Sequence, residues 1–454
     1  MEQHEIDWRS PLVAFAPLAG RDGAILLHGG DVAVGARWSF IAASPRNTVT
    51  SHDGKSFIDG MLTAASPFEA LSALHAQRRV KGSYREPPLV SGLIGFSGYE
   101  CGRFCEPSAK GPASPYSLPD FSFGAYDAVA AFDRLTRKAY LLGREATALE
   151  ELSSLLGAAD RSASASTRFC LPVSNFSRDA YCAAVAELVE KIRNGDLFQA
   201  NISQRFETTA SEAIDAFALF CAVARDSSSG FGAYFAIKGV SVISQSPERF
   251  FAVKPQASGR LAITAEPVKG TRPRGETPIK DARLLEELLS DPKDRAENIM
   301  IADLTRNDLS KICDDFTIRE DAICEAVSFA NVHHLVSRIS GRLRADISAA
   351  DALGALFPCG SITGAPKVEA MRAIAAIEKA GRGPYCGAIG YIDDRGGADF
   401  SVAIRIAVAE GRRLSIPVGG GVTLRSDPEA EYEETLTKAR QFLSHAGVKE
   451  RAAP

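Results

Sequence analysis

The chain has 454 residues, 45% hydrophobic and 24% charged, as in an ordinary soluble protein with one large unit or two closely packed ones. The net charge is −4 with dispersed basic residues, and no apolar run approaches the ~20 residues of a membrane span, so we expect neither a nucleic-acid nor a membrane partner. The polar N-terminus, MEQHEIDWRSPL, is unlike a secretory signal, so we expect a cytoplasmic protein.

The N-terminal third is rich in short strand-like runs, such as residues 125–134 and 138–143. Residues 157–168, GAADRSASASTR, are small and polar without apolar periodicity, which is typical of a linker or long surface loop. The sequence therefore predicts a strand-rich subdomain over residues 1–156 and a larger unit over residues 169–450.

Nine cysteines are scattered along the chain without a CxxC pair or a His-rich segment. The two closest, Cys101 and Cys105, lack the companion ligands of a zinc site. We therefore expect buried free thiols in a reducing compartment.

Residues 177–196 predict a helix, because their apolar side chains recur on one face and Gly195 is placed to end it. The apolar face consists of Cys182, Val185, Leu188, Val189 and Ile192. Residues 197–207 then switch to a period of two, which predicts a strand. Phe198, Ala200 and Ile202 would face one way, and Gln199, Asn201 and Ser203 the other. This polar row either faces solvent or lines a wet pocket.

Residues 231–253 predict two strands joined at Lys238–Gly239, and no repeat of fixed period is present. Strands and helices do not alternate regularly enough for a doubly wound sheet. The predicted fold class is therefore α+β with large, mostly antiparallel sheets.

Carboxylates collect on two predicted helices. Near the C-terminus, Asp427 can cap a helix that begins at Pro428. Glu431 and Glu434 share one face of it, with Lys438 one turn further on. This face is either solvated and salt-bridged or, together with Glu297 of a second helix, part of a site for a hard cation such as Mg²⁺.

Glycine-rich segments are dense in the second half of the chain, in PCGSITGAPK, GPYCGAIGYI and IPVGGGVTL. Each is a set of turns or brings backbone amides close to an anionic ligand. Arg405, on a strand pattern, either binds a ligand carboxylate or forms a structural ion pair. No dinucleotide or P-loop motif occurs, so neither dinucleotides nor nucleoside triphosphates are indicated.

Eight segments in order resemble the chorismate-utilising family that includes anthranilate synthase component I, aminodeoxychorismate synthase component I and the isochorismate and salicylate synthases. They are GDLFQANISQRF, SPERF, EPVKGTRPRG, AENIMIADLTRNDL, VHHLVSRISGRL, PCGSITGAPK, GPYCGAIGYI and GGGVTLRSDPEAEYEET. The N-terminal third matches more weakly, through ARWSFIAASP and GLIGFSGYE. The resemblance implies a sandwich of two sheets with surrounding helices, and it makes residues 169–450 the chorismate-binding catalytic domain.

Two positions separate the subfamilies. Members that add water to chorismate carry a lysine base where this chain has Gln199, and a neutral amide cannot deprotonate water. Anthranilate synthases usually have a small residue where this chain has Lys269. A lysine there resembles aminodeoxychorismate synthase, in which the amine is implicated as a nucleophile. The alternative for Lys269 is a charge that only stabilises its loop.

The resemblance also implies the remaining roles. Glu248 would be the acid that protonates the leaving hydroxyl. Glu297 and Glu434 match ligands of a Mg²⁺ cofactor, with Glu431 nearby, directly or through water. The implied substrate contacts are Gln199, Thr271, His334, Ser361, Tyr385, Arg405, Gly419, Gly420, Gly421 and Lys438.

Together these residues predict an aminodeoxychorismate synthase that converts chorismate to 4-amino-4-deoxychorismate, bound for 4-aminobenzoate and folate. No amidotransferase motif is apparent in the chain, so the ammonia would come from a separate glutaminase subunit, with free ammonia as a substitute in vitro. The alternatives are anthranilate synthase component I and a non-catalytic chorismate-binding subunit.

Three features depart from the family pattern. Arg425 replaces a frequent acidic residue, and Ile406 removes a hydroxyl near the pocket. Tryptophan-binding members usually carry LLES near the N-terminus, whereas this chain reads LLHGG, with His28 and Gly29. The sequence therefore does not predict feedback by tryptophan.

Overall fold

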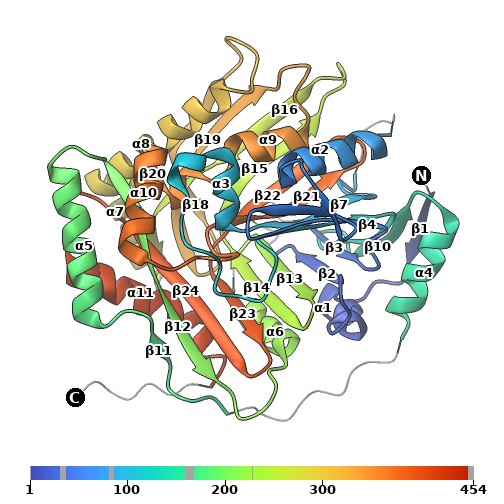
Figure 1. Ribbon diagram of the computed structural model, residues 1–454, viewed down its shortest axis with the longest axis horizontal. Coiled ribbons are helices and arrows are strands. Elements are labelled where there is room, and N and C mark those ends of the chain that lie inside the picture. Colours follow the sequence, from blue (N-terminus) through green and yellow to red (C-terminus); the bar gives the residue numbers. More distant parts are fainter. Residues whose placement is uncertain (1, 31–36, 81–85, 159–167, 228, 448–454) are drawn as a thin grey trace.

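The computed structural model describes residues 2–30, 37–80, 86–158, 168–227 and 229–447. Its strands form two sheets of 12 strands each (Figure 1), and every strand pair within them is antiparallel. Eleven helices surround the sheets in the described part of the chain. The predicted α+β class with large antiparallel sheets is confirmed.

The first sheet joins strands from both ends of the chain, and the short strand β20 extends it beside β12. In spatial order its strands are β1 (Glu2–Ile6), β10 (Lys138–Gly143), β9 (Ala128–Asp133), β3 (Trp38–Ala42), β2 (Ile25–His28), β13 (Phe231–Ile237), β14 (Val240–Ser246), β23 (Ile406–Glu410), β24 (Arg413–Val422), β12 (Gln199–Thr209), β11 (Val173–Ser174) and, off this path, β20 (Gly364–Ala365).

The second sheet likewise joins strands from distant parts of the chain, and β18 extends it beside β19. In spatial order its strands are β17 (Val268–Pro273), β19 (Val332–Arg342), β16 (Leu261–Glu266), β15 (Arg249–Pro255), β22 (Ala398–Ala403), β21 (Gly387–Asp393), β7 (Gly92–Ser97), β8 (Phe121–Tyr126), β4 (Asn47–His52), β5 (Lys55–Ile58), β6 (Met61–Thr63) and, off this path, β18 (Arg319–Ser328).

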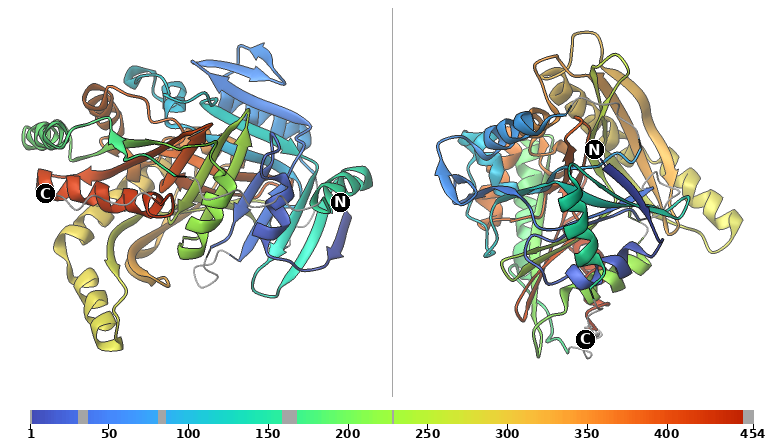
Figure 2. Two further views of the ribbon diagram at one scale, coloured as in Figure 1. Left: turned by 90° about the horizontal axis from the view of Figure 1, so that it is seen from below. Right: turned by 90° about the vertical axis from the view of Figure 1, so that its right-hand side faces the viewer.

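The helices cover the outer faces and edges of the two sheets (Figures 1 and 2). In Figure 2, the yellow helices α7 and α8 project with the strands beside them as a lobe. The helices are α1 (Pro11–Phe15), α2 (Pro67–Arg78), α3 (Gly102–Cys105), α4 (Ala146–Leu156), α5 (Arg178–Arg193), α6 (Ala216–Asp226), α7 (Pro278–Ser290), α8 (Pro292–Ser310), α9 (Ala349–Leu356), α10 (Lys367–Glu378) and α11 (Pro428–Leu443).

The main hydrophobic core lies between the two sheets, and a second one lies between the first sheet and its helices. Strand β13 contributes side chains to both of these cores. Ala233 and Phe235 belong to the core between the sheets, whereas Tyr234 and Ala236 belong to the core beneath the helices. The Tyr234 ring packs against Phe217 of α6 at 5.3 Å between centroids. Alternation along a strand thus supplies apolar side chains to both faces of the sheet.

The local signals predicted several boundaries well. The helix expected at 177–196 runs over Arg178–Arg193, and Gly195 follows it with a left-handed φ of 84°. The turn between β13 and β14 falls at Lys238–Gly239, both with positive φ. The side chain of Asp427 accepts from the backbone N–H of Ala430, so it caps α11 as predicted.

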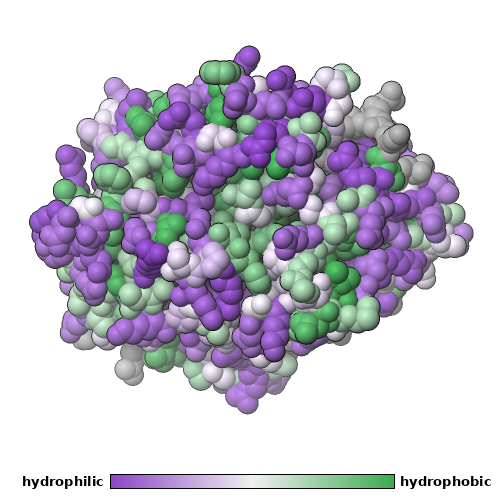
Figure 3. All heavy atoms as spheres, turned by 45° about the horizontal axis from the view of Figure 1, so that its top comes forward, coloured by the Kyte–Doolittle hydropathy of each residue, from purple (hydrophilic) through white to green (hydrophobic). Residues whose placement is uncertain are grey.

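The division of the chain at residues 157–168 stays a prediction, because residues 159–167 lie outside the described ones. Both sheets take strands from before and after this segment. Among the described residues, no helix is long and apolar enough to cross a membrane. The face drawn in Figure 3 is mostly hydrophilic, with apolar side chains in small groups.

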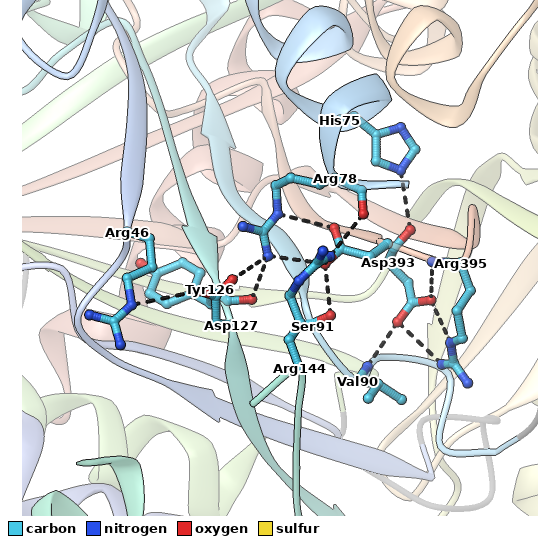
Figure 4. Close-up of polar contacts among 11 residues, drawn as sticks. Arg46, His75, Arg78, Val90, Ser91, Tyr126, Asp127, Arg144, Asp393 and Arg395 are labelled. Carbon is cyan, nitrogen blue, oxygen red and sulfur yellow. Dashed lines mark hydrogen bonds and ion pairs between the residues drawn. The ribbon is translucent and has the colours of Figure 1, made fainter. Parts of the chain in front are cut away.

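A buried group of charges joins α2 to the end of β21 (Figure 4). The carboxylate of Asp394 accepts from both Nε and Nη2 of Arg78, from Nη1 of Arg144 at 2.9 Å, and from the Ser91 hydroxyl at 2.7 Å. The side chain of Asp394 is fully buried. Each of these contacts joins segments far apart in the sequence, so this cluster fastens the fold together.

The neighbouring carboxylate of Asp393 is equally buried and equally well paired. It accepts from Nε of Arg395 at 2.7 Å and from the backbone N–H of Val90 at 2.8 Å. The ring of His75 contacts the Asp393 carbonyl (Figure 4). We refer to the contacts of Asp393 and Asp394 as the Asp393–Asp394 network.

Candidate active site

Strand β17 carries Lys269 and is interrupted by a bulge. Lys269 pairs with Leu335 of β19 and Thr271 pairs with His334, so one extra residue, Gly270, is accommodated between them. Gly270 has a left-handed φ of 81°, and a Cβ there would lie 3.0 Å from the side chain of Asp294. Bulges re-aim side chains and are frequent beside active sites. The glycine of the KGT motif therefore permits this geometry.

The amine of Lys269 lies in a half-buried polar pocket. Its Nζ donates to the carbonyl of Ser361 at 3.2 Å. A Cβ at Gly421 would meet Lys269 Nζ at 3.2 Å and Gln199 Nε2 at 2.6 Å. The amine, the amide and the glycine therefore pack closely, and a larger residue at position 421 would displace both side chains.

Glu248 lies between β14 and β15 and is buried, with 4% of its surface exposed. Burial raises the pKa of its carboxyl to about 7, although a hydrogen bond from Ser361 and the charge of Lys269 act in the opposite direction. Its Oε1 has no hydrogen-bond partner among the described residues. A carboxyl with such a pKa is partly protonated at neutral pH and can donate a proton.

Ser361 contacts both of these groups. It lies in the 3₁₀ turn Gly360–Ile362, with its carbonyl on Lys269 and its hydroxyl on Glu248. A Cβ at Gly360 would lie 2.6 Å from Leu304 of α8, so the turn packs tightly against that helix. The sequence-predicted acid, amine and serine thus converge in space.

Helix α11 presents Glu431, Glu434 and Lys438 toward the glycines of β24. The predicted ion pair forms, with 2.6 Å between Glu434 Oε1 and Lys438 Nζ. Lys438 also donates to the Gly419 carbonyl at 2.7 Å. A Cβ at Gly420 would lie 2.8 Å from Glu431 Oε2. The carboxylates therefore approach the strand where it has no side chains.

The two carboxylates of α11 differ in environment. Glu431 is buried, which raises its pKa, and its Oε1 accepts from the Ser426 hydroxyl at 2.7 Å. Glu434 is about half exposed. Partial burial raises the pKa of Glu434, but Lys438 lowers it more, so its net pKa lies below the ordinary value. A purely solvated acidic face is thus excluded for Glu431.

Glu297 faces these carboxylates from α8, which is the second predicted helix and begins after the Asp291 cap. Its side chain is 15% exposed, and its Oε1 has no hydrogen-bond partner among the described residues. Lys293 Nζ lies 3.9 Å away. Burial raises the pKa of Glu297, and Glu431 contributes to the increase, so the two carboxylates are electrostatic neighbours.

These carboxylates meet the requirements of a hard cation only in part. No three of them are close enough to form a complete metal site within the described residues. Mg²⁺ takes only one or two protein carboxylates and completes its shell with water and substrate oxygens. The unpartnered oxygen of Glu297 and the open backbone at Gly420 therefore fit such a shared shell.

Arg405 lies in the connection where the chain passes from the second sheet to the first. The predicted continuous strand over SVAIRIAV is wrong, because β22 ends at Ala403 and β23 begins at Ile406, with a left-handed φ of 51° at Arg405. Its Nη1 donates to Gln441 at 3.0 Å. Among the described residues, no carboxylate lies within ion-pair distance of Arg405, so the structural ion-pair interpretation is not supported.

Tyr385 and His334 lie near this guanidinium, and each interacts with it electrostatically. Tyr385 is buried. Burial lowers the pKa of His334 to about 4, so its ring is neutral at pH 7, and its Nδ1 lies 3.0 Å from the Thr271 hydroxyl. The aromatic ring of Phe329 packs edge-on against it.

The polar row of β12 is buried, so its solvent-facing interpretation is wrong. Gln199 is fully buried, and neither amide atom has a partner among the described residues. Asn201 and Ser203 are buried as well. Phe198 does not face the core with Ala200 as predicted, because it precedes β12 and is 70% exposed.

Sequence reasoning missed Gln441, the partner of Arg405. The available signal was its spacing, because Glu434, Lys438 and Gln441 lie four and three residues apart on α11. A cavity of about 800 Å³ between the sheets is not lined by any predicted site residue. His28 and Gly29 line that cavity instead, together with Trp38.

The sequence is similar to a known enzyme family and to members of it. The chorismate binding enzyme family matches residues 27–444. Aminodeoxychorismate synthase component 1 of Klebsiella aerogenes is 34% identical over 438 residues, which cover 94% of this chain and 95% of that protein. Anthranilate synthase component 1 of Methanothermobacter thermautotrophicus is 33% identical over 450 residues, covering 97% and 93%.

A solved structure is similar over most of its length. Anthranilate synthase component I from Streptococcus pneumoniae TIGR4 superposes with a TM-score of 0.78 at 28% identity, covering 89% of this chain and 92% of that one. The chain belongs to the chorismate-binding enzyme family.

Proposed function

We propose that this protein aminates chorismate to 4-amino-4-deoxychorismate, with Mg²⁺ as cofactor and ammonia as the nitrogen source. The observation that carries the proposal is the convergence of an amine and an acid. Lys269 and Glu248 share contacts with Ser361, and the charge of Lys269 acts on the Glu248 carboxyl. A lysine that only stabilised a loop would not need a half-buried place beside a buried acid.

The proposed reaction divides one difficult displacement into two steps. The neutral amine of Lys269 adds to carbon 2 of the ring, both conjugated ring double bonds shift, and the carbon 4 hydroxyl leaves as water with a proton from Glu248. Ammonia then adds to carbon 4, the double bonds shift back, and the amine of Lys269 is expelled. Protons from the lysine and ammonia nitrogens go to the departing amine and to Glu248, so the acid is restored.

Glu297, Glu431 and Glu434 would hold the metal. When bound, Mg²⁺ would supply positive charge for the ring carboxylate of chorismate. Glu297 has an unpartnered buried oxygen, and Glu431 is oriented by Ser426, so both are available for this purpose. Which of the α11 carboxylates contacts the ion directly is part of the proposal to be tested.

The rest of the pocket would bind the substrate. Arg405, Tyr385 and Lys438, with the backbone of Gly419, Gly420 and Gly421, would bind its carboxylates, with neutral His334 and Thr271 at its edge. Gln199 would contact the substrate through its unpartnered amide. Because an amide is no base, addition of water to chorismate is disfavoured at this site.

The ammonia would come from a separate glutaminase subunit in the cytoplasm, and the product would lead to 4-aminobenzoate and folate. Identification of the product tests the proposal. Purified protein is incubated with chorismate, Mg²⁺ and ammonium at mildly basic pH, with and without aminodeoxychorismate lyase. We expect 4-aminobenzoate only with the lyase, and its loss in Lys269→Ala but not in the exposed-lysine control Lys280→Ala.

The second candidate is the anthranilate synthase component I reaction. It is favoured by relatives of equal similarity, such as the 33% identical archaeal protein. In that reaction nitrogen enters at carbon 2 and pyruvate is lost. Accumulation of fluorescent anthranilate and pyruvate in the same assay would contradict the proposed amination at carbon 4.

A further inference from the structure

The functional face of α11 extends one turn beyond the predicted site residues. Glu431, Glu434, Lys438 and Gln441 are spaced three, four and three residues apart, which places their side chains on one side of a helix. Gln441 is half-buried, and its Oε1 accepts from Arg405 Nη1 at 3.0 Å. Gln441, which continues this face of the helix, therefore contacts the guanidinium of Arg405.

The backbone at Arg405 has an unusual conformation. A left-handed φ of 51° costs a non-glycine residue roughly 1–2 kcal/mol. The surrounding sheets maintain it, since the carbonyl of Arg405 accepts from the backbone N–H of Gln245 at 2.9 Å. Strained conformations of this kind are retained where they aim a functional side chain.

Two other arginines, one half-buried and one buried, are neutralised by carboxylates. Arg249 is paired with Asp399 and Glu266, and Arg382 is paired with Glu378. Arg405 differs from them, because the partner that the structure gives it is a neutral amide. Burial lowers the pKa of Arg405, although the charge of Glu434 acts in the opposite direction, as expected for a guanidinium without a carboxylate at contact distance. Its charge thus remains available to an anionic ligand.

We propose that Gln441 is a positioning residue for this site. Its amide oxygen fixes the guanidinium of Arg405 on the side of Tyr385 and His334 without neutralising it, so that the free N–H groups can pair with a carboxylate of the substrate. A carboxylate at position 441 would form an ion pair with Arg405 and neutralise it. An apolar side chain there would not fix the position of the guanidinium. This inference rests on the proposed binding of chorismate.

Three variants separate these effects. Gln441→Glu gives Arg405 an internal counter-ion, and Gln441→Met removes the acceptor at similar volume. Thr437→Glu adds the same charge on the exposed side of α11 and serves as the control. Consumption of chorismate is measured with Mg²⁺ and ammonium, whatever the product, and melting temperatures show that each variant is folded.

We expect Gln441→Glu to raise KM for chorismate about 10-fold with a smaller change in kcat, Gln441→Met to raise it about 3-fold, and Thr437→Glu to leave it unchanged. In an Arg405→Ala background, Gln441→Glu should have no further effect on KM. A purely structural role of Gln441 would shift the melting temperature and lower the active fraction, without raising KM more than it changes kcat.

Equal KM values for Gln441→Glu and the wild type would overturn the inference, and so would an undiminished effect in the Arg405→Ala background. If the wild type consumes no chorismate, the proposed function fails. The positioning role is then decided by calorimetric titration with chorismate, in which Gln441→Glu is expected to weaken Kd by the same factor. Unchanged Kd values would overturn it there too.

Discussion

Two buried groups of charges in this protein are built on opposite principles. In the Asp393–Asp394 network, every carboxylate oxygen is used (Figure 4). Asp394 accepts from Arg78, Arg144 and Ser91, and Asp393 accepts from Arg395 and a backbone amide. Nothing in this network is available to a ligand.

The Lys269 site is comparably buried and incompletely paired. Oxygens of Glu248 and Glu297 and both amide atoms of Gln199 have no hydrogen-bond partner among the described residues, and no carboxylate there lies within ion-pair distance of Arg405. An unsatisfied buried polar group costs about 1–3 kcal/mol. The comparison teaches that burial alone does not mark a functional site, whereas burial with unmet hydrogen-bonding capacity does.

The largest loss of turnover is expected from a substitution at Lys269. Replacing Lys269 by alanine should lower turnover by about 10³-fold or more, because the nucleophile is lost, while the melting temperature stays near that of the wild type. Product formation and thermal unfolding are measured on the same sample. A large loss of stability with retained turnover per folded molecule would place Lys269 among the structural residues.

The opposite outcome is expected in the Asp393–Asp394 network. Asp394→Asn leaves Arg78 and Arg144 without their charged partner, which should lower the free energy of unfolding by about 3–5 kcal/mol. Turnover per folded molecule should be unaffected. Urea unfolding tests this, with Asp303→Asn of the exposed Asp303–Arg306 pair as a control that is expected to change little. Normal stability of Asp394→Asn would refute the structural assignment.

The pH dependence sharpens the assignment of Glu248. Its pKa of about 7 means that the proton-donating form is lost as the pH rises through 7, so kcat/KM should fall above that value. Glu248→Gln should lower kcat/KM by about 10²-fold or more and abolish its decrease above pH 7. If kcat/KM of the variant still decreases above pH 7, the titrating group is not Glu248.

The same carboxyl affects stability in a defined direction. Because its folded-state pKa is raised, the stability that it contributes is present at low pH and is lost as the pH rises toward 7. Glu248→Gln should therefore be stabilised relative to the wild type by an amount that grows between about pH 4.5 and 7. Urea unfolding at both pH values measures this difference, and a constant difference would contradict it.

A smaller effect is predicted for the carboxylate on α8. Glu297→Gln should raise the Mg²⁺ concentration needed for half-maximal activity by at least about 10-fold, because one charged oxygen donor is removed. Titration of activity with Mg²⁺ measures this shift. The same titration of Asp303→Asn, on the exposed side of the same helix, should match the wild type. Equal requirements in Glu297→Gln would remove Glu297 from the proposed metal ligands.

Local sequence signals predicted the fold class and the ends of several elements. The Asp427 cap and the spacing of Glu431, Glu434 and Lys438 placed the functional face of α11, because side chains three and four residues apart meet on a helix. The family resemblance, in contrast, suggested that Lys269 and Glu248 belong to one site. Spacing along the chain could not show this, since Lys269 lies on β17 and Glu248 lies in the connection between β14 and β15.

The rest depended on tertiary structure. Period-two alternation does not say whether the second face of a strand meets solvent. In β12 the side chain of Gln199 lies beside Gly421 and beside Lys269 of the second sheet, so it is buried. The bulge at Gly270 belongs to the pairing of β17 with β19, and the left-handed Arg405 belongs to the crossover between the sheets. Gln441 lay on a face that the sequence already indicated, but its partner comes from the crossover between the sheets.

The most direct test of the account is a search for the covalent intermediate. Wild-type protein is mixed with chorismate and Mg²⁺ without ammonia, quenched in acid, and examined by intact-protein and peptide mass spectrometry. We predict a mass gain of one chorismate minus one water on the peptide that contains Lys269, and none in Lys269→Ala. No adduct in protein that turns over chorismate when ammonium is added would contradict the nucleophilic role of Lys269.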